Sequence, residues 1–269
     1  MVVIELGRSN ARLLAFASDF AGRMGIGLMG VAACQPMVAI YDQSMVLGDY
    51  VQQDRDELEA EIKIAKAEFY ETLDGRGIDL EWHSTITISS LCDYTVARAG
   101  AADIILCATG DEAMPVTSRR AGLGDIIMRA GRPVLLVPAP VEKLTLDHVV
   151  VAWKETREAR REIFDALPLL KRAGKVTVVE LVSDDELSAS KVRLDEVTGW
   201  LRHHQITVIG APALRIGDDT EQLARFFDKA GADLTVAGAY GHSRMREWAL
   251  GGVTRDLFLS PVRCALLSH

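Results

Sequence analysis

The sequence predicts an α/β protein made of two doubly wound, Rossmann-like domains, each with a five-stranded parallel sheet. Three observations favour this fold. Short apolar runs alternate with longer segments of helical periodicity along the 269 residues. A polar segment that begins at Pro138 interrupts this alternation near the middle of the chain, and the same order then restarts. Finally, two segments of the first half have close counterparts in the second half.

The repeat is visible in two pairs of segments. Residues 101–106, Ala-Ala-Asp-Ile-Ile-Leu, match residues 231–236, Gly-Ala-Asp-Leu-Thr-Val. Residues 133–137, Pro-Val-Leu-Leu-Val, match residues 261–265, Pro-Val-Arg-Cys-Ala. Two fused copies of one fold are the simplest account. We therefore expect the aspartates of the first pair to hold equivalent places in their sheets.

The domain boundary is expected in the polar connection from Pro138 to Asp147. We predict one domain at residues 1–140 and a second at residues 147–269. Each is long enough to bury a hydrophobic core of its own.

In the first half, the predicted strands are short apolar or alternating runs at 2–4, 26–33, 78–87, 103–108 and 133–137. The predicted helices have apolar residues at helical spacing and lie at 11–24, 52–73, 89–99 and 119–129. Gly25 is a good terminator of the first helix, because glycine adopts a left-handed backbone without strain.

In the second half, the same criteria predict strands at 148–153, 176–182, 206–209, 232–237 and 263–267. They predict helices at 156–172, 185–203, 220–230 and 255–259. Thr156 is a plausible N-cap for the first of these helices, since its hydroxyl can accept a hydrogen bond from a first-turn amide.

The composition limits the class of partner. The formal net charge is −8, with 49% hydrophobic and 25% charged residues, as in ordinary soluble proteins. A nucleic acid or an anionic membrane requires a basic surface, so the charge argues against both as the main partner.

The cysteines and the apolar region near residue 30 bear on the compartment. The four cysteines form no CxxC and no Cys/His ligand spacing: Cys34, Cys92, Cys107 and Cys264. We expect buried free thiols in a reducing compartment. Residues 31–34, Val-Ala-Ala-Cys, resemble a lipoprotein cleavage box, but Asp19 and Arg23 interrupt the approach to it. We therefore expect a buried strand there and a cytoplasmic protein.

A glycine-rich segment, residues 238–254, follows the last buried strand but one. Its glycines form two groups: Gly238 and Gly241, then Gly251 and Gly252. Glycines let a backbone approach a ligand closely, and free amides at the start of a helix favour an anion. Strand, glycines and helix together predict a phosphate-binding loop. The alternative is that the glycines only mark turns.

The spacing Gly-x2-Gly-x9-Gly, followed by Val-Thr, resembles the nucleotide loop of the universal stress proteins, and the resemblance extends over the chain as a tandem of two such domains. It implies a stress-response module that binds ATP or a related adenine nucleotide through its C-terminal half, with the need for a metal left open. The implied ligand contacts are Ala152, Lys154, Gly238, Gly241, His242, Gly251, Gly252, Val253 and Thr254.

Two residues depart from the family pattern. ATP-binding members usually carry an Asp at the end of the first strand, where it contacts the adenine, and Lys154 stands there. Lysine accepts no hydrogen bond from an adenine amino group, so it either pairs with phosphate or is simply solvated. Gly252 stands where the family has Ser or Thr, and Thr254 either supplies a hydroxyl or caps the next helix. Trp153 is expected in the core rather than against a base.

The first half has no matching loop. Residues 109–118 contain a single glycine, and three carboxylates lie where phosphate would bind: Asp111, Glu112 and Asp125. We interpret this half as a structural or pairing domain whose nucleotide site is degraded.

Three classes of function compete. The first is a nucleotide-binding module with slow hydrolysis at most, and the second is a ligand-free scaffold that acts through dimerisation or protein partners. The third, an enzyme on the same fold, lacks support because the chain has no P-loop and no Gly-x-Ser-x-Gly elbow. Universal stress proteins commonly pair through their last strands, so we expect a homodimer or a compact monomer whose halves imitate one.

Overall fold

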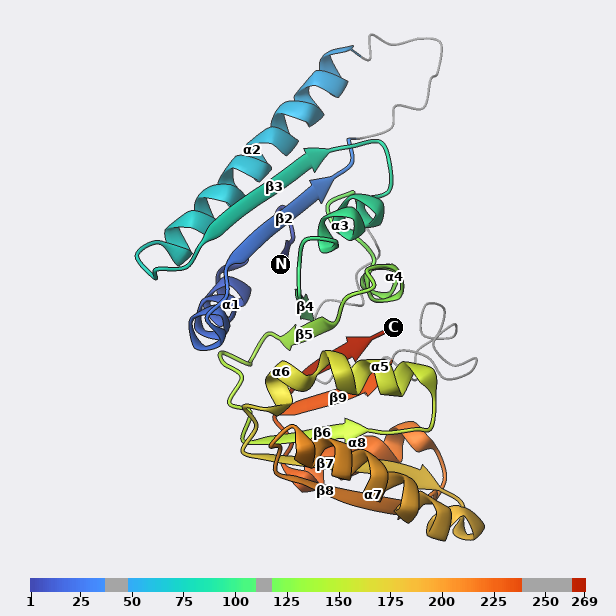
Figure 1. Ribbon diagram of the computed structural model, residues 1–269. Helices are drawn as coiled ribbons and strands as arrows, with labels where there is room; N and C mark the ends of the chain where they lie inside the picture. Colours follow the sequence, from blue (N-terminus) through green and yellow to red (C-terminus); the bar gives the residue numbers. More distant parts are fainter. Residues whose placement is uncertain (37–47, 110–117, 239–262) are drawn as a thin grey trace, which may run out of the picture.

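A computed structural model describes residues 1–36, 48–109, 118–238 and 263–269 (Figure 1). Its ten strands form one sheet in the order β3-β2-β1-β4-β5-β10-β9-β6-β7-β8. The strands of the first half are β1 Val2–Ile4, β2 Leu28–Cys34, β3 Leu80–Ile86, β4 Ile105–Thr109 and β5 Val134–Pro138. Those of the second half are β6 His148–Ala152, β7 Lys175–Val182, β8 Val208–Leu214, β9 Leu234–Gly238 and β10 Cys264–Ser268. Each half is therefore a five-stranded parallel sheet of doubly wound order, as predicted.

Helices cover both faces of the sheet. The helices of the first half are α1 Ala11–Met24, α2 Gly48–Leu73, α3 Leu91–Ala99 and α4 Leu123–Arg129. Those described in the second half are α5 Arg157–Asp165, α6 Leu167–Leu170, α7 Leu187–His203 and α8 Asp219–Ala230. Side chains of α1, α2, α5, α6 and α7 share one hydrophobic core, and those of α3, α4 and α8 share the other. The two cores lie on opposite faces of the sheet.

The two halves meet at the β5–β10 pair, the one antiparallel pair among the described strands. Leu135 is the Cα partner of Leu266 there. The connection between the halves is packed rather than loose, because Leu144 and Leu146 are 2% and 1% exposed. The backbone of Leu146 also accepts a hydrogen bond from the amide of Gly174 at 2.8 Å. The two halves thus share one continuous sheet within the chain, and the domain limits at 140 and 147 and the oligomeric state remain proposals.

The sheet register confirms one of the two repeat matches. Val2 pairs with Leu106 in the first half, and Val151 pairs with Val236 in the second. Asp103 and Asp233 lie three residues before Leu106 and Val236, so the aspartates hold equivalent places.

The second match is wrong by three residues. Leu106 pairs with Leu135, and Val236 pairs with Leu266. The counterpart of Leu135 is therefore Leu266, which makes Cys264 rather than Pro261 the counterpart of Pro133. The shared Pro-Val dipeptide misled the alignment, because a sheet aligns strands by their hydrogen-bonded register rather than by a dipeptide.

Most predicted elements are confirmed, and the differences have local causes. Helix α1 has the predicted bounds and ends at Gly25, whose φ of 70° is left-handed. The helix predicted at 156–172 is divided at Ala166 into α5 and α6, with Pro168 in the first turn of α6. Strand β8 runs on past the predicted end at residue 209, since Pro212 is tolerated in an edge strand. Helix α4 begins at Leu123, because Gly122 before it is extended.

Candidate ligand site

The described part of the predicted site lies at the carboxyl ends of β6 and β9. These strands are neighbours, and Ala152 is the Cα partner of Ala237. Ala152 ends β6, Gly238 ends β9, and Lys154 is exposed two residues beyond β6. In a doubly wound sheet this edge is where ligands bind. The other predicted contacts lie outside the described residues: Gly241, His242, Gly251, Gly252, Val253 and Thr254.

The segment after β6 turns directly into α5. Trp153 is 6% exposed and belongs to the core, as expected from the sequence. The Thr156 hydroxyl accepts a hydrogen bond from the Ala159 amide at 3.2 Å, which confirms the N-cap. Glu158 lies in the first turn, where backbone hydrogen bonding lowers the pKa of its carboxyl. The N-terminus of α5 thus carries its own cap and its own negative charge.

Gly238 has a packing role that the sequence analysis did not foresee. A Cβ atom at this position would lie 3.0 Å from Oε2 of Glu162 and 3.2 Å from the backbone nitrogen of Ala159. Real Cβ atoms are seldom this close to another atom, so α5 approaches the end of β9 as closely as a glycine permits. The close approach of helix to strand, rather than a ligand alone, accounts for glycine here.

The same place contains buried polar side chains. Glu162 is 0% exposed, and Ser268, the Cα partner of Gly238 in β10, is 1% exposed. Within the described residues, neither carboxyl oxygen of Glu162 and no hydroxyl of Ser268 has a hydrogen-bond partner. Burial raises the pKa of the Glu162 carboxyl well above its usual range, and the charge of Asp165 raises it further.

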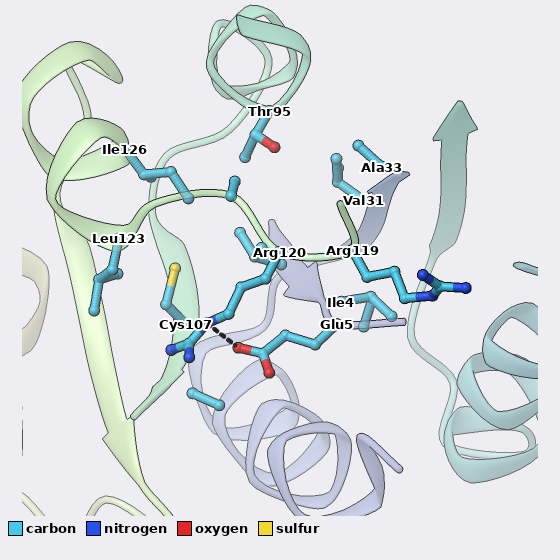
Figure 2. A pocket seen from close by; sticks show the side chains of 13 residues that line it. Ile4, Glu5, Val31, Ala33, Thr95, Cys107, Arg119, Arg120, Leu123 and Ile126 are labelled. Carbon is cyan, nitrogen blue, oxygen red and sulfur yellow. Dashed lines mark ion pairs between the residues drawn. The ribbon is translucent and has the colours of Figure 1, made fainter. Parts of the chain in front are cut away.

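The equivalent edge of the first half contains a pocket whose charged groups all have ion-pair partners (Figure 2). Glu5 follows β1 as Lys154 follows β6, three residues beyond Val2 and Val151 respectively. Its Oε1 lies 3.1 Å from Nε of Arg120, and both side chains are about 15% exposed. Figure 2 shows the Arg120 side chain reaching across the pocket toward Glu5, while Arg119 points away from it.

Arg119 makes a separate ion pair with Glu61 of α2, at 2.7 Å between Nε and Oε2. The pocket between these groups has mostly apolar walls, among them Ile4, Val31 and Ile126. Its volume, including the open mouth, is about 450 Å³, but about 20 Å³ remains for the centre of a water molecule. That is room for about one water. The Glu5–Arg120 pair therefore leaves no room for a ligand in this pocket, and a second hollow at the same edge is lined by Arg8, Arg12 and Thr109.

The sequence analysis did not identify Glu5 or Arg120, because it interpreted the first half from the absence of a glycine loop. The available signal was the position of Glu5 directly after the first strand, since Lys154 was identified by the same criterion. Of the three carboxylates named for this half, Asp125 lies in the first turn of α4, whereas Asp111 and Glu112 lie outside the described residues.

The four cysteines are free and buried, as predicted. Burial raises the pKa of Cys107 and Cys264 to about 12 and that of Cys34 to about 11, so these thiols are poor nucleophiles. Among the described residues, no three His, Cys, Asp or Glu side chains form a group that could bind a metal ion. No helix in the described ranges combines the length and the apolar character that crossing a membrane requires.

Comparison with solved structures identifies the fold. A universal stress protein from Archaeoglobus fulgidus DSM 4304 superimposes with a TM-score of 0.75 at 14% sequence identity, covering 99% of this chain and 95% of that one. A functionally unknown protein from Pseudomonas aeruginosa PAO1 gives a TM-score of 0.56 at 16% identity, covering 99% and 91%. No family sequence model and no curated protein sequence matches the chain. The chain thus has the fold of a full-length universal stress protein, as the loop motif led us to expect.

Proposed function

We propose that the chain is a regulatory module of a stress response that binds one adenine nucleotide of the ATP type in its C-terminal half. Support comes from the fold shared with the Archaeoglobus universal stress protein. The observation that carries the proposal is the difference between the two carboxyl edges. An ion pair lies in the first-half pocket next to the end of β1, whereas Lys154 is exposed two residues beyond the end of β6 in the second half.

The described residues indicate which groups would receive the phosphates. The N-terminus of α5 is already satisfied by Thr156 and Glu158, so it is a poor anion site. Lys154 offers a point charge at the same edge. The backbone amides of residues 238–254 would supply the remaining contacts, with Gly251 and Gly252 as the closest approach. Because Lys154 replaces a carboxylate, we expect weak selection for adenine over other bases.

The β5–β10 pair favours a monomer whose halves imitate a dimer. In this chain the last strand of each half is the neighbour of the other, so neither is an open edge for a second copy. We propose a cytoplasmic, pseudo-dimeric protein with domains at residues 1–140 and 147–269. Its output would be a conformational readout of the bound nucleotide, with slow hydrolysis at most.

The experiment has two arms. Mass spectrometry of gently purified and then denatured protein reports a co-purified nucleotide. Calorimetry with ATP, ADP and AMP then compares wild type with a G251V/G252V variant, in which added side chains block the loop. We expect binding in wild type and none in the variant, with unchanged circular dichroism. No binding by wild type at millimolar nucleotide would leave the scaffold hypothesis, in which protein partners contact the continuous sheet and its helices.

A further inference from the structure

At the carboxyl end of β9, the second half buries a carboxyl group beneath a helix. Glu162 of α5 is 0% exposed, and its Oε2 would lie 3.0 Å from a Cβ atom placed on Gly238. Ser268 is the Cα partner of Gly238, and Leu234 and Leu266 of the same two strands belong to the core on the α5 face. Since side chains of a strand alternate between faces, Gly238 and Ser268 both face α5. Glu162 thus lies against Gly238, on the face of the sheet to which Ser268 also points.

The first half has an apolar layer at the same place. The sheet register makes Ala108 the counterpart of Gly238, and Val137 the counterpart of Ser268. The buried positions of α1 and α5 match when Leu13 is aligned with Glu162, by the same offset that aligns Glu5 with Lys154. Leu13, Ala108 and Val137 lie together around one hollow. A leucine therefore suffices for the packing of this fold, and the carboxyl group of the second half requires another explanation.

The burial of Glu162 also carries a cost in folding free energy. A buried polar group without a hydrogen bond destabilises the folded state, because it has lost its water and gained no partner. The Gly238 backbone faces the carboxyl and favours its charged form, but burial and the nearby Asp165 outweigh this effect and favour the protonated form. Asp165 is itself paired with Arg161, and Glu158 lies one turn before Glu162 on α5. A carboxylic acid in this place can both donate and accept a hydrogen bond.

We propose that Glu162 is a positioning residue of the C-terminal ligand site, whose buried carboxyl packs against Gly238 and sets the path of the chain where it leaves β9. Its side chain is placed by α5, and it acts on the end of β9 at Gly238. Its effect on ligand affinity rests on the function proposed above. Its effect on the Gly238 backbone is a property of the unliganded protein and needs no nucleotide.

The test uses full-length protein with two substitutions. Glu162→Gln keeps the shape and the hydrogen-bonding capacity of the acid but cannot ionise, and Glu162→Leu reproduces the side chain of the first half. The ¹⁵N–¹H shift of the Gly238 amide is followed between about pH 5 and pH 9, a window that covers strongly raised carboxyl pKa values. The Ala108 amide is the internal control. We expect a titration step at Gly238 in wild type that E162Q removes, with no such step at Ala108.

Calorimetry with ATP supplies the second readout. E162L should bind about tenfold more weakly than wild type, because leucine presents no polar group to the Gly238 backbone, and E162Q should restore the affinity to within about threefold. If the Gly238 amide shift still titrates in E162Q, the proposal is overturned, even if E162L fails to fold. The proposal is also overturned if E162Q and E162L have the same Gly238 shifts and the same affinity for ATP. If wild type binds no nucleotide, the proposed function fails, and the Gly238 titration still decides the role of Glu162.

Discussion

The two halves use the same sheet order and treat the same edge of the sheet differently. In the first half, Glu5 is paired with Arg120 inside a mostly apolar pocket with room for about one water, and its other carboxyl oxygen is paired with Arg8. In the second half, Lys154 is exposed at the corresponding position. Glu162 is buried there without a hydrogen-bond partner among the described residues. The polar groups of the first half thus pair with each other, whereas those of the second half are left for a contact with another group.

This difference separates stability from function within one chain. Breaking a largely buried ion pair is destabilising because it leaves a charge without a partner, and an unpartnered buried acid already carries a cost of that kind. Sites that bind ligands commonly keep such a cost, because the missing partner arrives with the ligand or with the loop that contacts it. Substitutions at matched positions of the two halves test this difference.

The largest effect is expected from Gly238→Val. The added side chain would clash with Glu162 and with the backbone of α5, so we expect a loss of about 3 kcal/mol in the free energy of unfolding. Ala108→Val is the matched control in the first half, where a Cβ atom is already accommodated, and it should cost about 1 kcal/mol. Urea unfolding measures both. Equal losses would show that the close approach of α5 to β9 is not specific to the second half.

The Glu5–Arg120 pair should give the next largest effect. Glu5→Gln should cost about 2 kcal/mol, because it removes the carboxylate that faces the largely buried Arg120. Arg120→Gln should cost about 1 kcal/mol, because Glu5 keeps its ion pair with Arg8. The double variant should cost less than the two single losses combined, with a coupling of about 1 kcal/mol in a double-mutant cycle. Additive losses would mean that the pair does not fill the pocket as a unit.

The Glu162 acid should make stability depend on pH. Burial raises its folded-state pKa above the unfolded value of about 4.5, so the folded state keeps the proton longer than the unfolded state does. Its contribution is therefore fully present below pH 4.5 and is lost as the pH rises through the folded-state pKa. Glu162→Gln should raise the unfolding midpoint more at pH 8 than at pH 5. A difference between the variant and wild type that is constant with pH would contradict this assignment.

The smallest effect is expected from a surface pair. Arg225 and Glu221 are four residues apart on α8, with side chains 78% and 68% exposed. Arg225→Gln should change the free energy of unfolding by less than about 0.5 kcal/mol, and 0.5 M salt should remove the difference. This variant sets the baseline for the Glu5–Arg120 cycle.

The fold could be predicted from the sequence, because apolar periodicity and turn residues are local signals. They placed α1 at its observed bounds and identified Thr156 as a cap. The site could be predicted only in part. Lys154 and Gly238 follow strands and are visible as such, but the pairing of Glu5 with Arg120 joins residues more than a hundred positions apart. The packing of α5 on Gly238 likewise depends on tertiary contacts that no local pattern reveals.

The proposal that one nucleotide binds, in the C-terminal half, is tested most directly by the stoichiometry of ATP binding in calorimetry on wild type, G251V/G252V and E5Q/R120Q. We expect one nucleotide per chain in wild type and none in the loop variant G251V/G252V. The first-half variant E5Q/R120Q should bind one nucleotide with unchanged affinity. Two nucleotides per wild-type chain, or binding that survives in G251V/G252V and is lost in E5Q/R120Q, would contradict the proposal.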